Sequence, residues 1–187
     1  GGTDFSTTNQ AKKYGHETAI YYQDDFDATR WLKINAGVRA SMFNFMGPFS
    51  KIVFDESGRA TDTLNYKAGA NIKTYFGIEP RLSMRFKVDK TSSIKMGATF
   101  NRQYIHLVSS ATTTLPLDLW VPSTAQVKPQ SGVQTSVGYF RNFKDDMFET
   151  SVELYYKYMW NQIEYGESAI PANITVDVED QFTFGKG

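Results

Sequence analysis

The sequence predicts an all-β fold: an antiparallel up-and-down meander of about six strands that forms part of a large transmembrane β-barrel. Three observations support this prediction. Apolar and polar residues alternate along most of the chain, short and long connections follow one another, and aromatic residues gather near the ends of the alternating segments. Successive side chains of a strand point to opposite faces, so the alternation indicates a sheet with one apolar and one polar face.

The composition excludes several kinds of partner and site. Among the 187 residues, 20 are basic and 20 are acidic, and there is no cysteine. A balanced charge argues against a nucleic-acid partner, and a chain without cysteine has neither disulfides nor thiolate metal sites. No apolar run reaches the roughly 18 residues that a membrane helix needs, but barrel strands alternate and never form such a run.

Two segments show the alternation most clearly. In residues 32–42 the even positions are apolar and the odd positions are polar or small, from Leu32 and Lys33 onward. Residues 78–88 follow the same rule, with Pro80 on the apolar face. Because proline has no amide hydrogen, Pro80 predicts an edge position or the end of regular pairing. Four further segments with the same pattern are residues 19–26, 94–100, 133–139 and 148–158.

The connections between these segments alternate in length. Residues 27–30, 89–92 and 142–146 are short and rich in Asp, Asn, Lys and Ser, which favours turns. Residues 44–74, 103–131 and 163–187 are long. Outer-membrane barrels combine short periplasmic turns with long extracellular loops. We therefore interpret residues 1–187 as a partial barrel of three hairpins.

Aromatic side chains near the strand ends suggest two interfacial girdles, as in membrane barrels. One set lies beside the short turns and the other toward the long loops. The first set is Trp31, Phe86, Phe143 and Phe148, and the second is Phe43, Phe45, Tyr104, Tyr158 and Trp160.

The polar faces carry full charges in the middle of the predicted strands. A wide barrel has a hydrated interior in which such charges can lie, so we expect them to face the lumen. The alternative is a soluble antiparallel sheet with its charged face in water. The charged residues concerned are Arg39, Arg81, Arg85, Lys95, Glu153 and Lys157.

Several stretches in order resemble the barrel region of TonB-dependent outer-membrane receptors of the Bacteroidetes type. They are residues 19–26 (AIYYQDDF), 34–39 (INAGVR), 77–83 (GIEPRLS), 103–107 (QYIHL), 117–122 (LDLWVP), 128–130 (KPQ) and 151–157 (SVELYYK). The resemblance implies a barrel of about twenty-two strands in the outer membrane of a Gram-negative bacterium.

This resemblance also implies a function and partners. It predicts a receptor that takes up a small nutrient by energy coupling, with outer-membrane lipid around the barrel and a plug domain inside it. We expect the plug domain, the remaining strands and the segment that contacts TonB to lie outside residues 1–187. The alternative is a soluble or surface-exposed β-sheet binding module without transport activity.

The loop 103–131 holds the candidate ligand-binding residues Tyr104, His106, Asp118 and Trp120, because exposed aromatics often mark binding. For Trp120 we favour packing onto the barrel rim over ligand contact. His16 and His106 are far apart in sequence and lack metal-ligand spacing. No nucleophile elbow or phosphate-binding glycine loop occurs. The sequence therefore predicts no enzyme activity, no metal and no cofactor.

Overall fold

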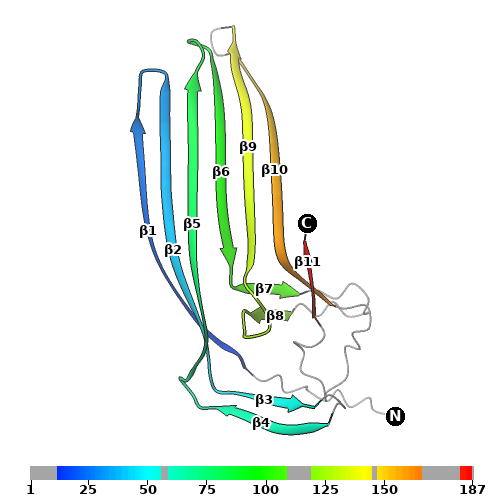
Figure 1. Ribbon diagram of the computed structural model, residues 1–187. Helices are drawn as coiled ribbons and strands as arrows, with labels where there is room; N and C mark the ends of the chain where they lie inside the picture. The colour runs from blue at the N-terminus through cyan, green and yellow to red at the C-terminus, as the bar shows by residue number, and fades with distance from the viewer. Residues whose placement is uncertain (1–11, 56–58, 109–118, 145–146, 166–181, 187) are drawn as a thin grey trace, which may run out of the picture.

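A computed structural model describes residues 12–55, 59–108, 119–144, 147–165 and 182–186. The regular elements in this part of the chain are all β-strands, arranged in one seven-stranded sheet and two two-stranded sheets. Figure 1 shows the large sheet as a single curved layer, with both small sheets at the end opposite the short turns. No membrane-spanning helix occurs within the described residues.

The seven-stranded sheet is an antiparallel meander, which confirms the predicted fold class. Its strand order is β1-β2-β5-β6-β9-β10-β11. All six predicted strands are present and longer than predicted, and β11 adds a seventh. The bounds are β1 Tyr14–Asp27, β2 Leu32–Met46, β5 Asn71–Lys87, β6 Ser92–Gln103, β9 Gln130–Phe143, β10 Phe148–Tyr165 and β11 Phe182–Lys186.

The long connections contain short hairpins of their own that the alternation did not reveal. β3 (Phe49–Phe54) pairs with β4 (Ala60–Tyr66), and β7 (Ile105–Val108) pairs with β8 (Leu119–Pro122). With four residues each, β7 and β8 are too short to show a period of two above chance. The central strands are long by contrast: β5 has 17 residues and β10 has 18. A tilted strand crosses a bilayer in about 9–11 residues, so these strands are long enough to extend beyond one.

The observed register gives the sheet two chemically different faces. Direct partners lie on the same face of the sheet. Ala36 and Leu82 are such a pair on the apolar face, and Arg85 and Lys95 are such a pair on the polar face. The apolar face is uncovered: Ile20 is 75% exposed, and Leu154 is 69% exposed. The buried apolar residues in the described ranges are few, and they cluster at the long-loop end. They are Phe43, Phe45, Tyr104, Val108, Val121 and Val127.

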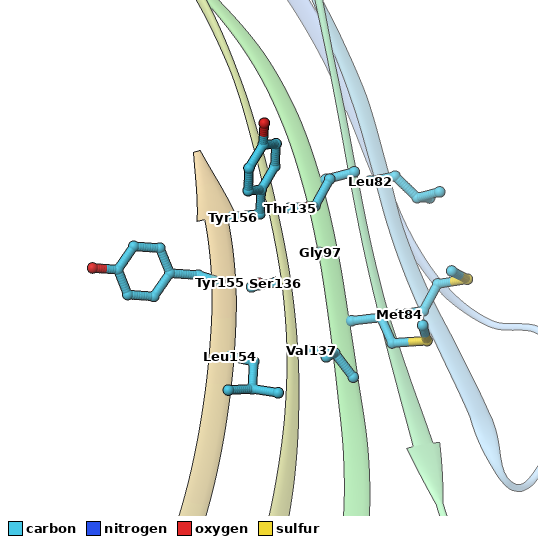
Figure 2. A pocket seen from close by; sticks show the side chains of 11 residues that line it. Leu82, Met84, Gly97, Thr135, Ser136, Val137, Leu154, Tyr155 and Tyr156 are labelled. Carbon is cyan, nitrogen blue, oxygen red and sulfur yellow. The ribbon is translucent and has the colours of Figure 1, made fainter. Parts of the chain in front are cut away.

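This distribution is the opposite of a soluble sheet, whose apolar face lies on a core. Large exposed apolar side chains recur on this face in β1, β2, β5, β6, β9 and β10, whereas soluble monomers rarely expose large apolar patches. The apolar face is hollowed by a groove of about 470 Å³ over β5, β6, β9 and β10. Its wall includes Leu82, Met84 and Leu154, while Tyr155 and Tyr156 leave β10 in different directions (Figure 2). The groove has the apolar lining that suits lipid chains.

The aromatic residues divide between the two faces. Trp31 stacks on Phe86 at the short-turn end, and Trp160 lies 5.7 Å from Tyr158, between ring centroids, at the other end. Both arrangements fit interfacial girdles. Assignment of Phe43, Phe45 and Tyr104 to the outer girdle was wrong. In β2, Phe43 and Phe45 share the parity of the polar face, and Tyr104 stacks on Phe43, with ring centroids 5.2 Å apart.

The sheet opens beside Pro80, in agreement with its lack of an amide hydrogen. Strand β5 pairs with β2 along its whole length, but its pairing with β6 stops at Arg81 and Thr99. Beyond that point the guanidinium of Arg102 donates a hydrogen bond to the carbonyl oxygen of Phe76 (2.6 Å). A side-chain donor thus joins two strands whose backbone ladder has ended, and the chain leaves β6 here toward β7.

Candidate functional site

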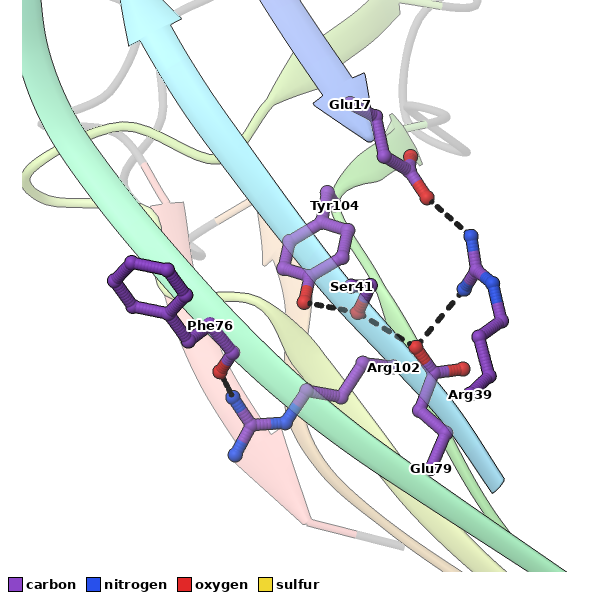
Figure 3. Close-up of polar contacts among 7 residues, drawn as sticks. All are labelled: Glu17, Arg39, Ser41, Phe76, Glu79, Arg102 and Tyr104. Carbon is purple, nitrogen blue, oxygen red and sulfur yellow. Dashed lines mark hydrogen bonds and ion pairs between the residues drawn. The ribbon is translucent and has the colours of Figure 1, made fainter. Parts of the chain in front are cut away.

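The long-loop end of the polar face holds a buried polar network. The guanidinium of Arg39 and the hydroxyl of Ser41 donate to one oxygen of Glu79, over 2.9 and 2.8 Å. The hydroxyls of Ser41 and Tyr104 lie 2.8 Å apart, so the chain of contacts continues into the loop after β6 (Figure 3). Arg39 also binds Glu17 of β1 over 2.7 Å. The network therefore connects three strands with Tyr104.

Two glycines make room for the aromatic residues of this end. A Cβ atom at Gly77 would lie 2.5 Å from the hydroxyl of Tyr104 and 2.6 Å from that of Ser41. A Cβ atom at Gly15 would lie 2.6 Å from the ring of Phe43. Such distances are too short for any real side chain, so these glycines allow the stacked rings to lie against the sheet.

Tyr104 leads directly into the hairpin β7–β8, which we call the rim hairpin. Figure 1 shows it lying across the long-loop end of the large sheet. One side of it is buried: Val108 and Val121 form a cluster with Val127, against which Ile163 of β10 packs. The backbone amide of Ser123 donates to the carbonyl of Tyr104 over 2.7 Å.

The turn that follows the rim hairpin is fixed to the polar face as well. The hydroxyl of Tyr75 donates to the carbonyl oxygen of Thr124 over 2.7 Å. Tyr75 is the direct partner of Phe43, so it belongs to the polar face of the sheet. At the other side, the amide of Asn161 donates to the carbonyl of Pro129 (3.1 Å). Asn161 has a positive φ of 56° and interrupts the β10–β11 register, a conformation that asparagine tolerates better than most residues.

The other side of the rim hairpin is exposed and apolar. Trp120 is 65% exposed and pairs directly with Leu107, and Ile105 lies two pairs further along, on the same face. The expectation that Trp120 packs onto the rim is therefore wrong. Alternation along β8 explains the difference, because Val121 takes the buried position and leaves Trp120 on the outer face.

The remaining candidate ligand residues divide into two groups. Tyr104 and His106 are both only 2% exposed, and their observed partners are protein hydroxyls. In this arrangement they support the rim hairpin and present no surface to a ligand. Asp118 lies outside the described residues. Sequence reasoning missed Glu79 and Ser41, although both fall on the polar face predicted from alternation.

His106 is buried as a neutral imidazole. Its Nε2 lies 3.1 Å from the hydroxyl of Ser123. Burial is the main cause that lowers the pKa of His106 to about 4, with a smaller opposing contribution from Gln130. The charged form would have to leave water without an anionic partner, which is unfavourable.

We predict that the rim hairpin loosens in acid. The unfolded loop takes up a proton near the ordinary histidine pKa of about 6.5, whereas the folded loop resists protonation until about pH 4. Stability is thus complete above about pH 6.5 and is lost progressively toward pH 4, by about 3 kcal/mol for the local unit. Hydrogen exchange of residues 104–108 at pH 7 and pH 5, corrected for intrinsic rates, measures this loss.

A matched control for this prediction is His106→Gln, whose amide can replace Nε2 but does not titrate. Protection in the variant should differ little between pH 7 and pH 5. An equal loss of protection in the wild type and the variant would show that another group is responsible.

The six predicted lumen charges all lie on the polar face of the sheet, as the register shows. Arg85 is the direct partner of Lys95. Arg81 is connected to Lys157 by a row of direct partners across the sheet, through Thr99 and Gln134. Among them, Arg39 alone takes part in an ion pair within the described residues. No group of three or more His, Asp or Glu side chains in these residues is placed to hold a metal.

The fold and this site together define a class of protein. A single-layer antiparallel sheet has an exposed apolar face, a polar face with charges, short turns at one end and a seated hairpin at the other. These are the features of the wall of an outer-membrane barrel. The chain matches the family described as "TonB dependent receptor-like, beta-barrel" over residues 1–184. The chain belongs to this family. No curated protein and no solved structure matched the chain.

Proposed function

We propose that this chain forms part of the barrel wall of an outer-membrane receptor that imports a scarce nutrient by energy coupling to TonB. Membership of the TonB-dependent receptor-like barrel family supports the transport class. The observation that carries the proposal is the pairing of an exposed apolar face with a polar face that holds the rim hairpin. Lipid suits the first face, and a hydrated lumen suits the second.

The partners follow from this arrangement. Lipid would cover the apolar face, and a plug domain would face Arg39, Arg81, Arg85, Lys95, Glu153 and Lys157. In the part of the chain that the structure describes, the outer edge of β1 has no partner strand, and β11 covers only residues 160–165 of β10. Lipid does not tolerate open edges, so further strands would pair there. Contact with TonB would use segments outside residues 1–187.

The exposed side of the rim hairpin is the proposed ligand contact. Trp120 and Leu107 form an aromatic and aliphatic surface next to the polar face of the sheet. An aromatic side chain held by a fixed hairpin can stack on a ring of a metal chelate, cofactor, peptide or glycan. The nutrient enters from the long-loop side in this proposal, since long loops are extracellular in such barrels.

A growth screen of the host bacterium tests the transport function. A strain that lacks the full-length gene is compared with its complemented strain on single limiting iron chelates, cobalamins, peptides and glycans. We expect the deletion strain to lose growth on one class, and a protonophore to abolish uptake of that nutrient in the complemented strain. Equal growth of both strains on all classes would contradict the proposal.

The contact itself is tested by Trp120→Ala in the full-length receptor. Removal of a central aromatic contact typically costs about 2 kcal/mol, so we expect affinity for the nutrient to fall about tenfold or more. Trp31→Ala is the matched control, because Trp31 is also exposed, at 52%, but lies at the short-turn end. An equal change in both variants would exclude a specific role for Trp120.

A further inference from the structure

Three cations lie directly opposite one another on the polar face near the short turns. Arg85 of β5 is the direct partner of Lys33 in β2 and of Lys95 in β6. Like charges in this arrangement destabilise a sheet. Asp25 neutralises Lys33 over 3.2 Å. Arg85 and Lys95 take part in no ion pair among the described residues.

The same place contains a hollow of about 630 Å³, which we call the basic hollow. Arg85, Lys87 and Lys95 all contribute to its lining, and Ser93 lies beside them. The ammonium of Lys95 lies 3.9 Å from the ring centroid of Phe140, which fixes it by a cation–π contact. Positively charged hydrogen-bond donors are therefore concentrated in the lining of the hollow.

Among the described residues that line the hollow, the carboxylates do not balance the cations. These residues include four cations, since Lys90 also contributes, and the two carboxylates of Asp89 and Glu149. Asp89 is already occupied, because its Oδ1 accepts the backbone amides of Thr91 and Ser92, each over 2.7 Å. Hydrogen bonds from Ser92 and Thr91 hold the pKa of Asp89 at about 2. An excess of positive charge stays on the wall.

We propose that the basic hollow is an anion-binding site that takes phosphate or carboxylate oxygens between Arg85 and Lys95. A planar guanidinium binds two such oxygens at once, and a neighbouring ammonium adds a third charged donor. The bound anion would remove the repulsion between the two opposed cations. The inference rests on the proposed function, in which this face lines the lumen. The anion belongs either to a passing solute or to an acidic protein segment that fills the barrel.

Calorimetric titration of the purified full-length receptor in detergent with citrate and pyrophosphate at low salt tests the site. We expect binding that Arg85→Gln/Lys95→Gln weakens about tenfold or more, because hydrogen bonds to charged groups are lost. Lys157→Gln is the matched control: it removes one charge from the same face, but Lys157 does not line the hollow. Its affinity for both anions should stay at the wild-type value.

Thermal unfolding distinguishes the source of the anion. If an acidic protein segment already fills the hollow, the wild type binds neither probe, and the double variant unfolds at a lower temperature than Lys157→Gln. The proposal is overturned if neither probe binds and the double variant is as stable as Lys157→Gln or more stable, because relief of repulsion then dominates. Arg85→Lys, which keeps the charge, replaces the double variant should that variant fail to assemble. None of these readouts depends on uptake, so their failure is distinct from failure of the transport proposal.

Discussion

Replacing Leu154 by arginine is expected to prevent assembly of the full-length protein in the outer membrane. Leu154 lies in the middle of β10 on the apolar face and is 69% exposed. An arginine that faces lipid near the bilayer centre costs about 2–4 kcal/mol, which an assembling barrel cannot recover from contacts within the wall. The folded fraction in the outer-membrane preparation, measured by resistance to unfolding in cold detergent, should fall about tenfold or more.

Tyr155→Arg is the control for this experiment. Tyr155 is the next residue, is 76% exposed and points to the polar face. In a barrel its arginine would enter a hydrated lumen, and assembly should be nearly normal. If both faces of the sheet lay in water, both substitutions would be nearly neutral, as at most exposed positions. Two equally mild variants would therefore contradict the membrane orientation of this sheet.

Alternation was enough to predict the sheet because a period of two leaves no freedom in the choice of face. Once Leu32 and Ile34 are assigned to one face, Lys33 and Arg39 must lie on the other. The same rule made the charged residues predictable as a group. Pro80 was informative for a different reason. Proline has no amide hydrogen to donate to a neighbouring strand, and the hydrogen-bonded pairing of β5 with β6 ends beside Pro80.

The rim hairpin was beyond the reach of this reasoning. Its strands have four residues each, and their packing depends on contacts with β5 and β10 that are distant in sequence. The wrong assignment of Phe43 and Phe45 is a different case, because the alternation of the strand already indicated which face each side chain occupies. Phe43 and Phe45 share odd positions with Arg39 in one strand, which already placed them on the polar face. Proximity to a strand end was the weaker of the two signals.

Glu79 could not be identified as the centre of the polar network without the register of β2 against β5. Those strands are joined by a long connection that contains β3 and β4, so no tight turn sets their register. The pairing of Arg39 with Glu79 is a consequence of the fold. The sequence predicts only that both residues lie on polar faces.

The burial of Glu79 makes it the second site of large expected effect. Its side chain is almost entirely buried and accepts hydrogen bonds from Arg39 and Ser41. Glu79→Ala leaves these donors without their acceptor, and loss of one member of a buried charged pair costs about 3–5 kcal/mol. Arg39 keeps its contact with Glu17, so we expect a value near the lower end, about 3 kcal/mol.

The effect should appear first at the rim hairpin, because Ser41 links Glu79 to Tyr104. Chymotrypsin cleaves after large apolar residues, and Leu107 and Trp120 are both exposed, so cleavage there reports on opening of the hairpin backbone. We expect cleavage of the full-length Glu79→Ala protein to be at least about tenfold faster than that of the wild type.

Glu17→Gln provides a sharp control, because Glu17 binds the same guanidinium from a partly exposed position. Exposed ion pairs contribute at most about 1 kcal/mol, so this variant should be cleaved at nearly the wild-type rate. Glu79→Gln keeps a carbonyl acceptor for Ser41 and should fall between the two. The cleavage rate should therefore be highest for Glu79→Ala, lower for Glu79→Gln and lowest for Glu17→Gln, because the buried acceptor matters more than the exposed one. Equal cleavage of Glu79→Ala and Glu17→Gln would show that the rim hairpin is held by its apolar cluster of Val108, Val121 and Val127 instead of by this network.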